Sequence, residues 1–191
     1  MGNRSDTGEP CFERRAALGG VSAALLASFG GEPAAAQDSQ LSNGPLSEFP
    51  IVLPKSEFVY EALFDLEPVM MLGQGPLGER RIIPIVGGVF AGPRIKGKVL
   101  PGGADRQLVR KDGAKILNAL YELQTDDGAV VTVNNRVLID KRPDGTPYVF
   151  SNIDITAPEG PHDWLNHLVF VGTLHGMAPK PQVLIRVYSL T

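Results

Sequence analysis

Sulfur chemistry is almost absent from this sequence. Its only cysteine, Cys11, lies near the start of the chain, ahead of an apolar segment that we interpret as part of an export signal. Removal of that signal leaves a domain with no disulfide, no thiol nucleophile and no cysteine metal ligand. The formal net charge of -3 gives no basic excess. We therefore expect no nucleic-acid partner and no attraction to an anionic membrane.

Common catalytic motifs are also missing. There is no Gly-x-Ser-x-Gly elbow and no HExxH motif, and between residues 55 and 183 the only serines are Ser56 and Ser151, neither beside a histidine or an aspartate in sequence. The glycine-rich segments GPLGER and GGVFAG are not followed by a helix that could offer amide groups to a phosphate. These absences argue against a serine hydrolase, a dinucleotide-binding fold and a P-loop.

Histidine is scarce, and the three histidines fall close together, at His162, His167 and His175. On one strand, residues 162 and 167 would point to opposite faces, and no cysteine lies nearby to complete a zinc site. We expect no metal and no cofactor. An alternative use is an acid/base unit formed by His162 with the neighbouring Asp163.

Residues 1–36 have the pattern of a cleavable export signal. Arg14 and Arg15 precede a small and apolar run over residues 16–29, and the sequence PAAAQ then supplies a cleavage site before Gln37. The run is too short for a bilayer, which takes about 20 apolar residues. The paired arginines favour a twin-arginine signal; an ordinary Sec signal is the alternative. We expect a bacterial periplasmic protein with no stable membrane insertion after cleavage.

Beyond the signal, residues 37–54 are rich in Ser, Asn, Gly and Pro, and we predict a flexible N-terminal tail. Residues 55–191 are long enough for one domain with its own core. From Ser56 to Leu66 apolar and polar residues alternate, which predicts a strand that Pro68 ends. Gly and Pro predict a loop over residues 73–78, followed by a short strand over 80–86.

Three turn sequences then predict consecutive antiparallel hairpins: Lys111-Asp112-Gly113, Asp126-Asp127-Gly128 and Arg142-Pro143-Asp144-Gly145. They separate predicted strands over residues 107–110, 115–125, 129–140 and 148–156. Further strands are expected over 164–173 and 183–190. Eight to ten strands without a long helix predict an all-β domain, either a single antiparallel β-barrel or a strongly curved sandwich.

The segment from Gly87 to Gln107 combines many glycines and two prolines with short apolar runs. Glycine inside a strand marks a bulge, a corner or a close backbone approach. We interpret the segment as a bent strand pair that curves the sheet and ends on a polar cluster of Asp105, Arg106 and Gln107.

Four sequence blocks, in the same order, resemble the domain of unknown function family 3237, also called uncharacterised protein family 0311. They are GERRIIPIVGG (78–88), GPRIKGKVLPGGADRQLVRKDG (92–113), YELQTDDGAVVTVNNR (121–136) and WLNHLVFVGT (164–173). The resemblance covers residues 58–188. It implies a mainly antiparallel, lipocalin-like β-barrel with a central cavity, and it implies no general activity.

Two positions depart from the pattern of that family. Members often carry Trp where Arg106 stands, and an aromatic residue where His162 or Asp163 stands. If these positions face the cavity, the ligand is more polar or more anionic than that of a typical member. If they face outward, nothing follows for the ligand.

Polar residues that recur in the family-like blocks are the candidates for a site. We expect Asp105 to act as a base, with Arg94, Arg136 and Asn166 positioning a carbonyl or carboxylate. The alternative is that Asp105 pairs with Arg94 or Arg136 only to close the barrel. Catalytic candidates are Asp105, Arg94, Arg136 and His162; ligand-binding candidates are Arg81, Gln107, Tyr121, Asn134, Trp164 and Asn166.

These residues predict an exported barrel that binds a small, partly apolar carbonyl or carboxylate compound. The expected chemistry is cofactor-independent acid/base catalysis of the isomerase, hydratase or lyase type. Two alternatives stay open, a non-catalytic periplasmic carrier and a homo-oligomeric structural subunit. An enzyme's cavity should hold a titratable group, a carrier's should be almost wholly apolar, and a structural subunit's should be filled by side chains.

Overall fold

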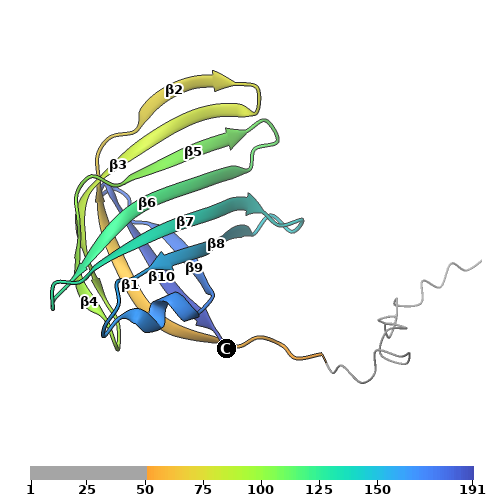
Figure 1. The fold of residues 1–191 in the computed structure, drawn as a ribbon. Coiled ribbons are helices and arrows are strands. Elements are labelled where there is room, and N and C mark those ends of the chain that lie inside the picture. Colours follow the sequence, from red (N-terminus) through yellow and green to blue (C-terminus); the bar gives the residue numbers. More distant parts are fainter. Residues whose placement is uncertain (1–50) are drawn as a thin grey trace, which may run out of the picture. The chain divides into compact units, whose positions relative to one another are not determined.

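The computed structural model describes residues 51–191, and the predicted signal and residues 37–50 lie outside that range. The described chain forms ten strands joined by short connections (Figure 1). Their bounds are β1 Ser56–Leu66, β2 Met70–Gly75, β3 Gly78–Ala91, β4 Lys96–Val99, β5 Ala104–Arg110, β6 Lys115–Thr125, β7 Val130–Lys141, β8 Pro147–Thr156, β9 Phe170–Gly176 and β10 Gln182–Leu190. A 3₁₀ helix, η2 (Asp163–His167), lies between β8 and β9.

Every strand pairing is antiparallel, and the sheet closes on itself. Neighbouring strands follow the order β1-β10-β9-β8-β7-β6, then β4 and β5 fill one position in succession between β6 and β3. The pairing of β3 with β1 completes the ring. The predicted all-β fold is confirmed as a closed antiparallel barrel of eight strand positions, and the sandwich alternative is wrong.

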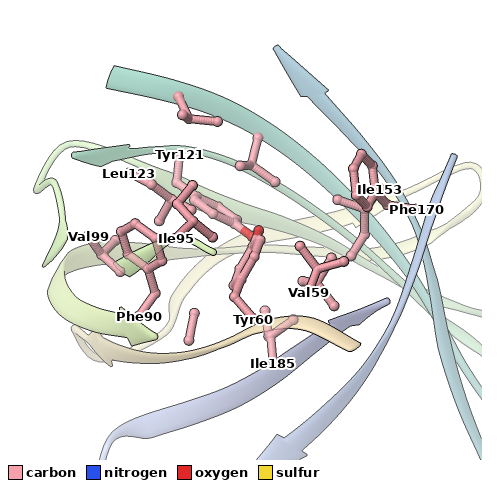
Figure 2. Packing of buried hydrophobic residues seen from close by; sticks show 14 of the residues in the cluster. Val59, Tyr60, Phe90, Ile95, Val99, Tyr121, Leu123, Ile153, Phe170 and Ile185 are labelled. Carbon is pink, nitrogen blue, oxygen red and sulfur yellow. The ribbon is translucent and has the colours of Figure 1, made fainter. Parts of the chain in front are cut away.

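The apolar face of β1 packs into the core as its alternation predicts. Tyr60, Ala62 and Phe64 are buried, although a register shift between Phe58 and Tyr60 also buries Val59. Tyr60 meets Phe90 edge-on with ring centroids 5.7 Å apart. Figure 2 shows this cluster, in which Phe90, Ile95 and Val99 pack near Tyr60 and Tyr121. The core therefore fills the end of the barrel near β4, where each large apolar side chain contributes about 1.5–3 kcal/mol.

The glycine-rich segment bends the wall as predicted. Gly88 has a φ of +138°, and a Cβ atom there would lie 2.1 Å from the carbonyl oxygen of Leu63 on β1. A Cβ on Gly97 would meet the carbonyl oxygen of Gln124 on β6 at the same distance. Only glycine lets these backbones approach so closely, so the segment joins β3, β4 and β5 into a strongly curved wall.

Three predicted boundaries are wrong. The short strand predicted over residues 80–86 is part of the longer β3, which continues to Ala91. Residues 73–78 are not an open loop, because β2 pairs with β3 and a tight turn at Pro76 and Leu77 joins them. Gly73, with a φ of +82°, sits at a register shift in β2. Among the described residues β2 pairs with β3 alone, and its Met70 and Met71 are exposed.

The predicted strand over 164–173 is replaced by η2 and the shorter β9. Leu165 of the 3₁₀ helix is buried in the core, which an extended strand with Trp164 inward would not allow. The three predicted hairpin turns are all present, between β5, β6, β7 and β8. Within residues 51–191, no helix is long and apolar enough to cross a bilayer.

Candidate functional site

A cavity of about 220 Å³ lies inside the barrel, lined by strands β1, β3, β5, β6, β7, β9 and β10. Most of its wall is aliphatic or aromatic. Gly176 and Gln182 on its rim are at least partly exposed, so the cavity reaches solvent. The polar side chains that line it are Asp105, Gln107, Tyr121, Asn135 and Gln182.

The strand register explains how these side chains meet. Asp105 on β5 pairs with Ala119 on β6, and Ala119 pairs with Asn135 on β7. Directly paired residues share a face of the sheet, so the three form one inward row. Gln107 and Tyr121 are each two residues away from a member of this row, on the same face. Asp105 and Asn135 therefore face one cavity with Ala119 between them.

Asp105 is held in place by two hydrogen bonds. Its Oδ2 accepts from Nε2 of Gln107 at 2.6 Å, and its Oδ1 accepts from the backbone N–H of Asn118 at 3.0 Å. Burial nevertheless raises the pKa of the Asp105 carboxyl above its ordinary value, because desolvation outweighs both hydrogen bonds. Of the described residues that line the cavity, Asp105 alone carries a carboxyl group. Asp105 is half-buried, and a half-buried carboxyl with a raised pKa in a cavity is suited to proton transfer.

Three fully buried polar side chains lie in the barrel interior without a hydrogen-bond partner among the described residues. They are Tyr60 and Tyr121, through their hydroxyls, and Asn135, through both atoms of its amide. Burial is the main cause that raises the pKa of both tyrosine hydroxyls, which stay neutral and able to donate at physiological pH. The two hydroxyls point toward each other (Figure 2) and influence each other's pKa, although their geometry is not that of a hydrogen bond.

Arg94 does not reach Asp105, contrary to both interpretations of the pair. Its guanidinium lies over the ring of Trp164, 3.9 Å from the centroid. The two residues line a separate hollow of about 180 Å³ beside Glu57, at the start of β1, whereas the cavity adjoins Leu66 at the end of β1. Arg94 and Trp164 therefore belong to the opposite end of the barrel.

Arg136 and Asn134 face outward and are exposed, so the prediction that they act in the cavity is wrong. The inward residue is Asn135, which the prediction missed. The sequence pattern could have identified Asn135. Val131, Val133 and Val137 form the apolar face of β7, and Asn135 lies on that face because side chains alternate along a strand.

His162 is buried, but its partner is Asp127 and not the predicted Asp163. Its Nε2 lies 2.9 and 3.0 Å from the two carboxylate oxygens of Asp127. Thr125 Oγ1 also donates to this carboxylate. The hydrogen bond from Thr125, and then that from His162, lower the pKa of Asp127. His162 does not line the cavity, and this arrangement ties a hairpin turn to the loop before η2.

Asn166 also has a structural role outside the cavity. Its side chain accepts from the backbone N–H of Ala157 at 2.9 Å and donates to the backbone oxygen of the same residue at 3.0 Å. It also donates to Asp163 at 2.8 Å, which is the main cause of the lowered pKa of Asp163. Asn166 therefore fixes η2 against the end of β8 and does not line the cavity.

The remaining predicted ligand-binding residues differ in position. Gln107 and Tyr121 lie on the cavity wall. Arg81 pairs in register with Gln107 on the same face, but its guanidinium is bound to Glu79 at 2.5 Å and it does not line the cavity. Arg106 is exposed on the outer face. Because Arg106, His162 and Asp163 all lie outside the cavity, they carry no information about the polarity of a ligand there.

No metal site is evident in this part of the chain. Across residues 51–191 there is no group of three or more His, Cys, Asp or Glu side chains that could hold a metal ion. His167 binds Asp163 at 3.2 Å, in an exposed pair. His175 lies on β9 and is exposed.

The fold and the cavity define a small closed β-barrel with an interior that is mostly apolar and carries one carboxyl group. A family model confirms what the sequence blocks indicated. The chain belongs to the family described as protein of unknown function DUF3237, whose model matches residues 54–190.

Relatives and solved structures agree with this assignment. A UPF0311 protein from Clostridium acetobutylicum is 39% identical over 153 residues, which cover 71% of this chain and 96% of that protein. The crystal structure of a beta-barrel like protein from Acinetobacter baumannii matches with a TM-score of 0.69 and 28% identity, over 75% of this chain and 99% of that one. A hydroalkoxylation enzyme, phnH, from Penicillium herquei is 29% identical over 120 residues, or 63% of this chain and 74% of that enzyme.

Proposed function

We propose that this barrel binds a small, largely apolar organic molecule with a carbonyl or phenolic oxygen and transfers a proton on it without a cofactor. The observation that carries this proposal is Asp105, a carboxyl group with a raised pKa inside an aliphatic cavity. The cavity of about 220 Å³ is somewhat larger than the roughly 150 Å³ that accommodates benzene. It therefore suits a substrate of one or two rings.

The chemistry follows from a single proton-transfer group. In its charged form, Asp105 removes a proton from a carbon conjugated with a carbonyl of the substrate, and the electron pair of that C–H bond passes into the carbonyl to give an enolate. Return of the proton from Asp105 to another carbon completes an isomerisation. If a hydroxyl of the substrate loses the proton and its oxygen adds to the conjugated double bond, return of the proton to carbon completes an addition. Both sequences conserve atoms and electrons.

The relative from Penicillium herquei supports the second course. It is named a hydroalkoxylation enzyme, and addition of an O–H group across a double bond needs only a group that accepts and returns a proton. This reaction belongs to the hydratase and lyase type. We propose the same type of chemistry, proton transfer without a cofactor, for this chain. We do not propose the same substrate.

A non-catalytic carrier is the second candidate, because the cavity wall is predominantly apolar. Asp105 distinguishes the two functions, since a carrier for an apolar molecule has no need of a desolvated carboxyl group. A purely structural subunit is less well supported, because the interior is hollow. The feature that favours self-association is the exposed edge of β2, which pairs with no second strand within residues 51–191.

We further propose that the protein acts after export, in the bacterial periplasm. The support comes from the sequence of residues 1–36, with Arg14 and Arg15 ahead of a short apolar run. A twin-arginine route carries folded proteins, and a closed barrel with a preformed cavity is compatible with that route.

The test of the proposed chemistry is proton exchange on candidate substrates. A panel of one- and two-ring conjugated ketones and phenols is incubated with the protein in D₂O, and NMR follows both deuterium incorporation and product formation. Wild type should accelerate at least one compound, and Asp105→Asn should lose about 10²–10⁴-fold of that rate. Asp154→Asn, which removes an exposed carboxylate, is the matched control and should keep it. An Asp105→Asn variant that folds and retains the full rate would overturn the proposal.

A further inference from the structure

The buried amide of Asn135 is the feature of the cavity that the proton-transfer chemistry leaves unexplained. Asn135 is 0% exposed, and neither its Nδ2 nor its Oδ1 has a hydrogen-bond partner among the described residues. An unsatisfied buried polar group costs about 1–3 kcal/mol. An aliphatic side chain at this position would avoid that cost, as the three valines on the same face of β7 do.

Tyr121 is a second buried polar residue of the cavity wall. Its hydroxyl is fully buried and has no hydrogen bond of acceptable geometry to any described residue, although the Tyr60 hydroxyl and the Asn135 amide lie near enough to shift its pKa. Tyr121 and Asn135 line the same cavity. The ring of Phe64 packs edge-on against it with centroids 4.7 Å apart, so the tyrosine ring is held in one orientation. The hydroxyl of Tyr60, a residue that does not line the cavity, points toward that of Tyr121 (Figure 2). Tyr121 and Asn135 thus place a hydroxyl group and an amide, both buried, just behind the inner wall of an apolar cavity.

We propose that Tyr121 and Asn135 form a hydrogen-bonding site for the oxygen of a conjugated ketone or phenol, on the same wall of the cavity as Asp105. This inference rests on the proposed function for the role of Asp105. It adds the class of substrate, because the site needs an acceptor oxygen that gains negative charge when the proton moves. Neutral donors in a desolvated pocket stabilise such an oxygen strongly.

The barrel wall also fixes the separation between the two ends of the substrate. Asp105 and Asn135 lie two strand positions apart on one row, or about 10 Å between backbones. Both side chains project into the cavity from this row, and Ala119 between them carries only a methyl group. The oxygen and the atom that exchanges its proton are therefore separated by a conjugated chain or ring, and a simple ketone with the two adjacent is too short.

The experiment compares two probes that differ in one hydroxyl group, 4-fluorophenol and fluorobenzene. Their binding to the whole protein is measured by ¹⁹F NMR titration. Wild type should bind 4-fluorophenol about tenfold more tightly than fluorobenzene, which corresponds to one good hydrogen bond. Tyr121→Phe and Asn135→Leu should each reduce that preference, and the double variant should abolish it without weakening fluorobenzene.

Asn134→Leu is the matched control, since the same substitution one residue away falls on the outer face and should leave both affinities unchanged. Thermal unfolding supplies the second readout. Because Tyr121→Phe and Asn135→Leu remove polar atoms that have no partner in the described chain, they should not lower the melting temperature.

Three results would overturn the inference. They are a double variant that keeps the tenfold preference, a wild type that binds neither probe, and a marked loss of stability in both single variants, which would show that the polar atoms serve the core. The outcome is independent of the exchange assay. If Asp105→Asn exchanges protons as fast as wild type but the preference depends on Asn135, the oxygen site stands and the proposed chemistry fails.

Discussion

Asp105 and Asn135 face the same cavity from one row of the barrel wall, with only the methyl group of Ala119 between them. One is a carboxyl whose pKa burial raises, and the other is an amide with no partner in the described chain. The hydrogen bonds from Gln107 and Asn118 fix the direction of the carboxyl. We expect Asp105 and Asn135, and not the polar groups at the other end of the barrel, to be the functional part of the molecule.

Ala119→Leu should block the cavity. The larger side chain occupies the space between Asp105 and Asn135, and we expect the affinity for 4-fluorophenol to fall by at least tenfold. Because the side chain enters an existing cavity, the fold should tolerate it, with less than the 1–3 kcal/mol loss typical of overpacking. Ala91→Leu, the same substitution at an exposed position on β3, should bind as wild type does. Unchanged binding in Ala119→Leu would place the ligand elsewhere.

Asp105→Asn should stabilise the protein at neutral pH. The carboxyl has a higher pKa in the folded state than in the unfolded state. Between these two pKa values the folded state binds more protons, so the stability of wild type falls as the pH rises. The two proteins should be similarly stable below the ordinary carboxyl pKa of about 3.9. Above that pH the variant should become more stable than wild type, and the difference in the free energy of unfolding should become constant once the pH exceeds the pKa of Asp105 in the folded state. The asparagine can still accept from Asn118. Urea unfolding across pH measures this, and a variant that is less stable at every pH would contradict it.

Asp127→Asn should act in the opposite direction. The hydrogen bonds from Thr125 and His162 lower the pKa of Asp127, so its contribution to stability is present above the unfolded pKa and disappears as pH falls through the folded value. The variant should be less stable than wild type at pH 7, and the difference should shrink on acidification. Asp126→Asn is the control, because its exposed pair with Lys96 at 3.4 Å contributes little. Proton exchange on the substrate should be unaffected by Asp127→Asn. A loss of exchange would show that His162 and Asp127 take part in the reaction.

Arg94→Ala should change the fluorescence of Trp164, the only tryptophan in the chain. The guanidinium lies 3.9 Å from the ring centroid, and its removal should cost about 0.5–1 kcal/mol. Arg136→Ala, on the exposed outer wall, should change neither property. Since the cavity lies at the other end of β1, cavity ligands should leave the emission of Trp164 nearly unchanged. Strong quenching by 4-fluorophenol would contradict this placement.

Arg14→Lys together with Arg15→Lys should prevent export if the signal is of the twin-arginine type, because that route reads the arginine pair itself. The charge is kept, so a Sec signal would tolerate the change. Arg4→Lys serves as the control. Cell fractionation, with N-terminal sequencing of the mature protein near Gln37, gives the readout. Full export of the double variant would show that the Sec alternative is right.

The sequence predicted the barrel well because its signals are local. Alternation in β1, three Asp-Gly turns and the glycines between residues 87 and 107 each determine nearby backbone geometry, and together they leave few folds open. The sequence pattern failed where tertiary packing determines the local structure. In η2, for example, the burial of Leu165 in the core favours a 3₁₀ helix over the predicted strand.

The site was only partly predictable. Asp105, Gln107 and Tyr121 were identified from their sequence blocks, and the parity of β7 could have selected Asn135 over Asn134. Nothing local placed Arg94 over Trp164 or His162 beside Asp127, because both contacts join segments that are distant in sequence and meet only when the barrel closes.

A crystal structure of the protein with bound 4-fluorophenol tests the central claim most directly. We predict the ring between Asp105 and Asn135 against Ala119, with its oxygen within hydrogen-bonding distance of Tyr121 Oη and the Asn135 amide. A cavity that holds only ordered water bridging Tyr60, Tyr121 and Asn135, with the phenol bound outside the barrel or not at all, would contradict it.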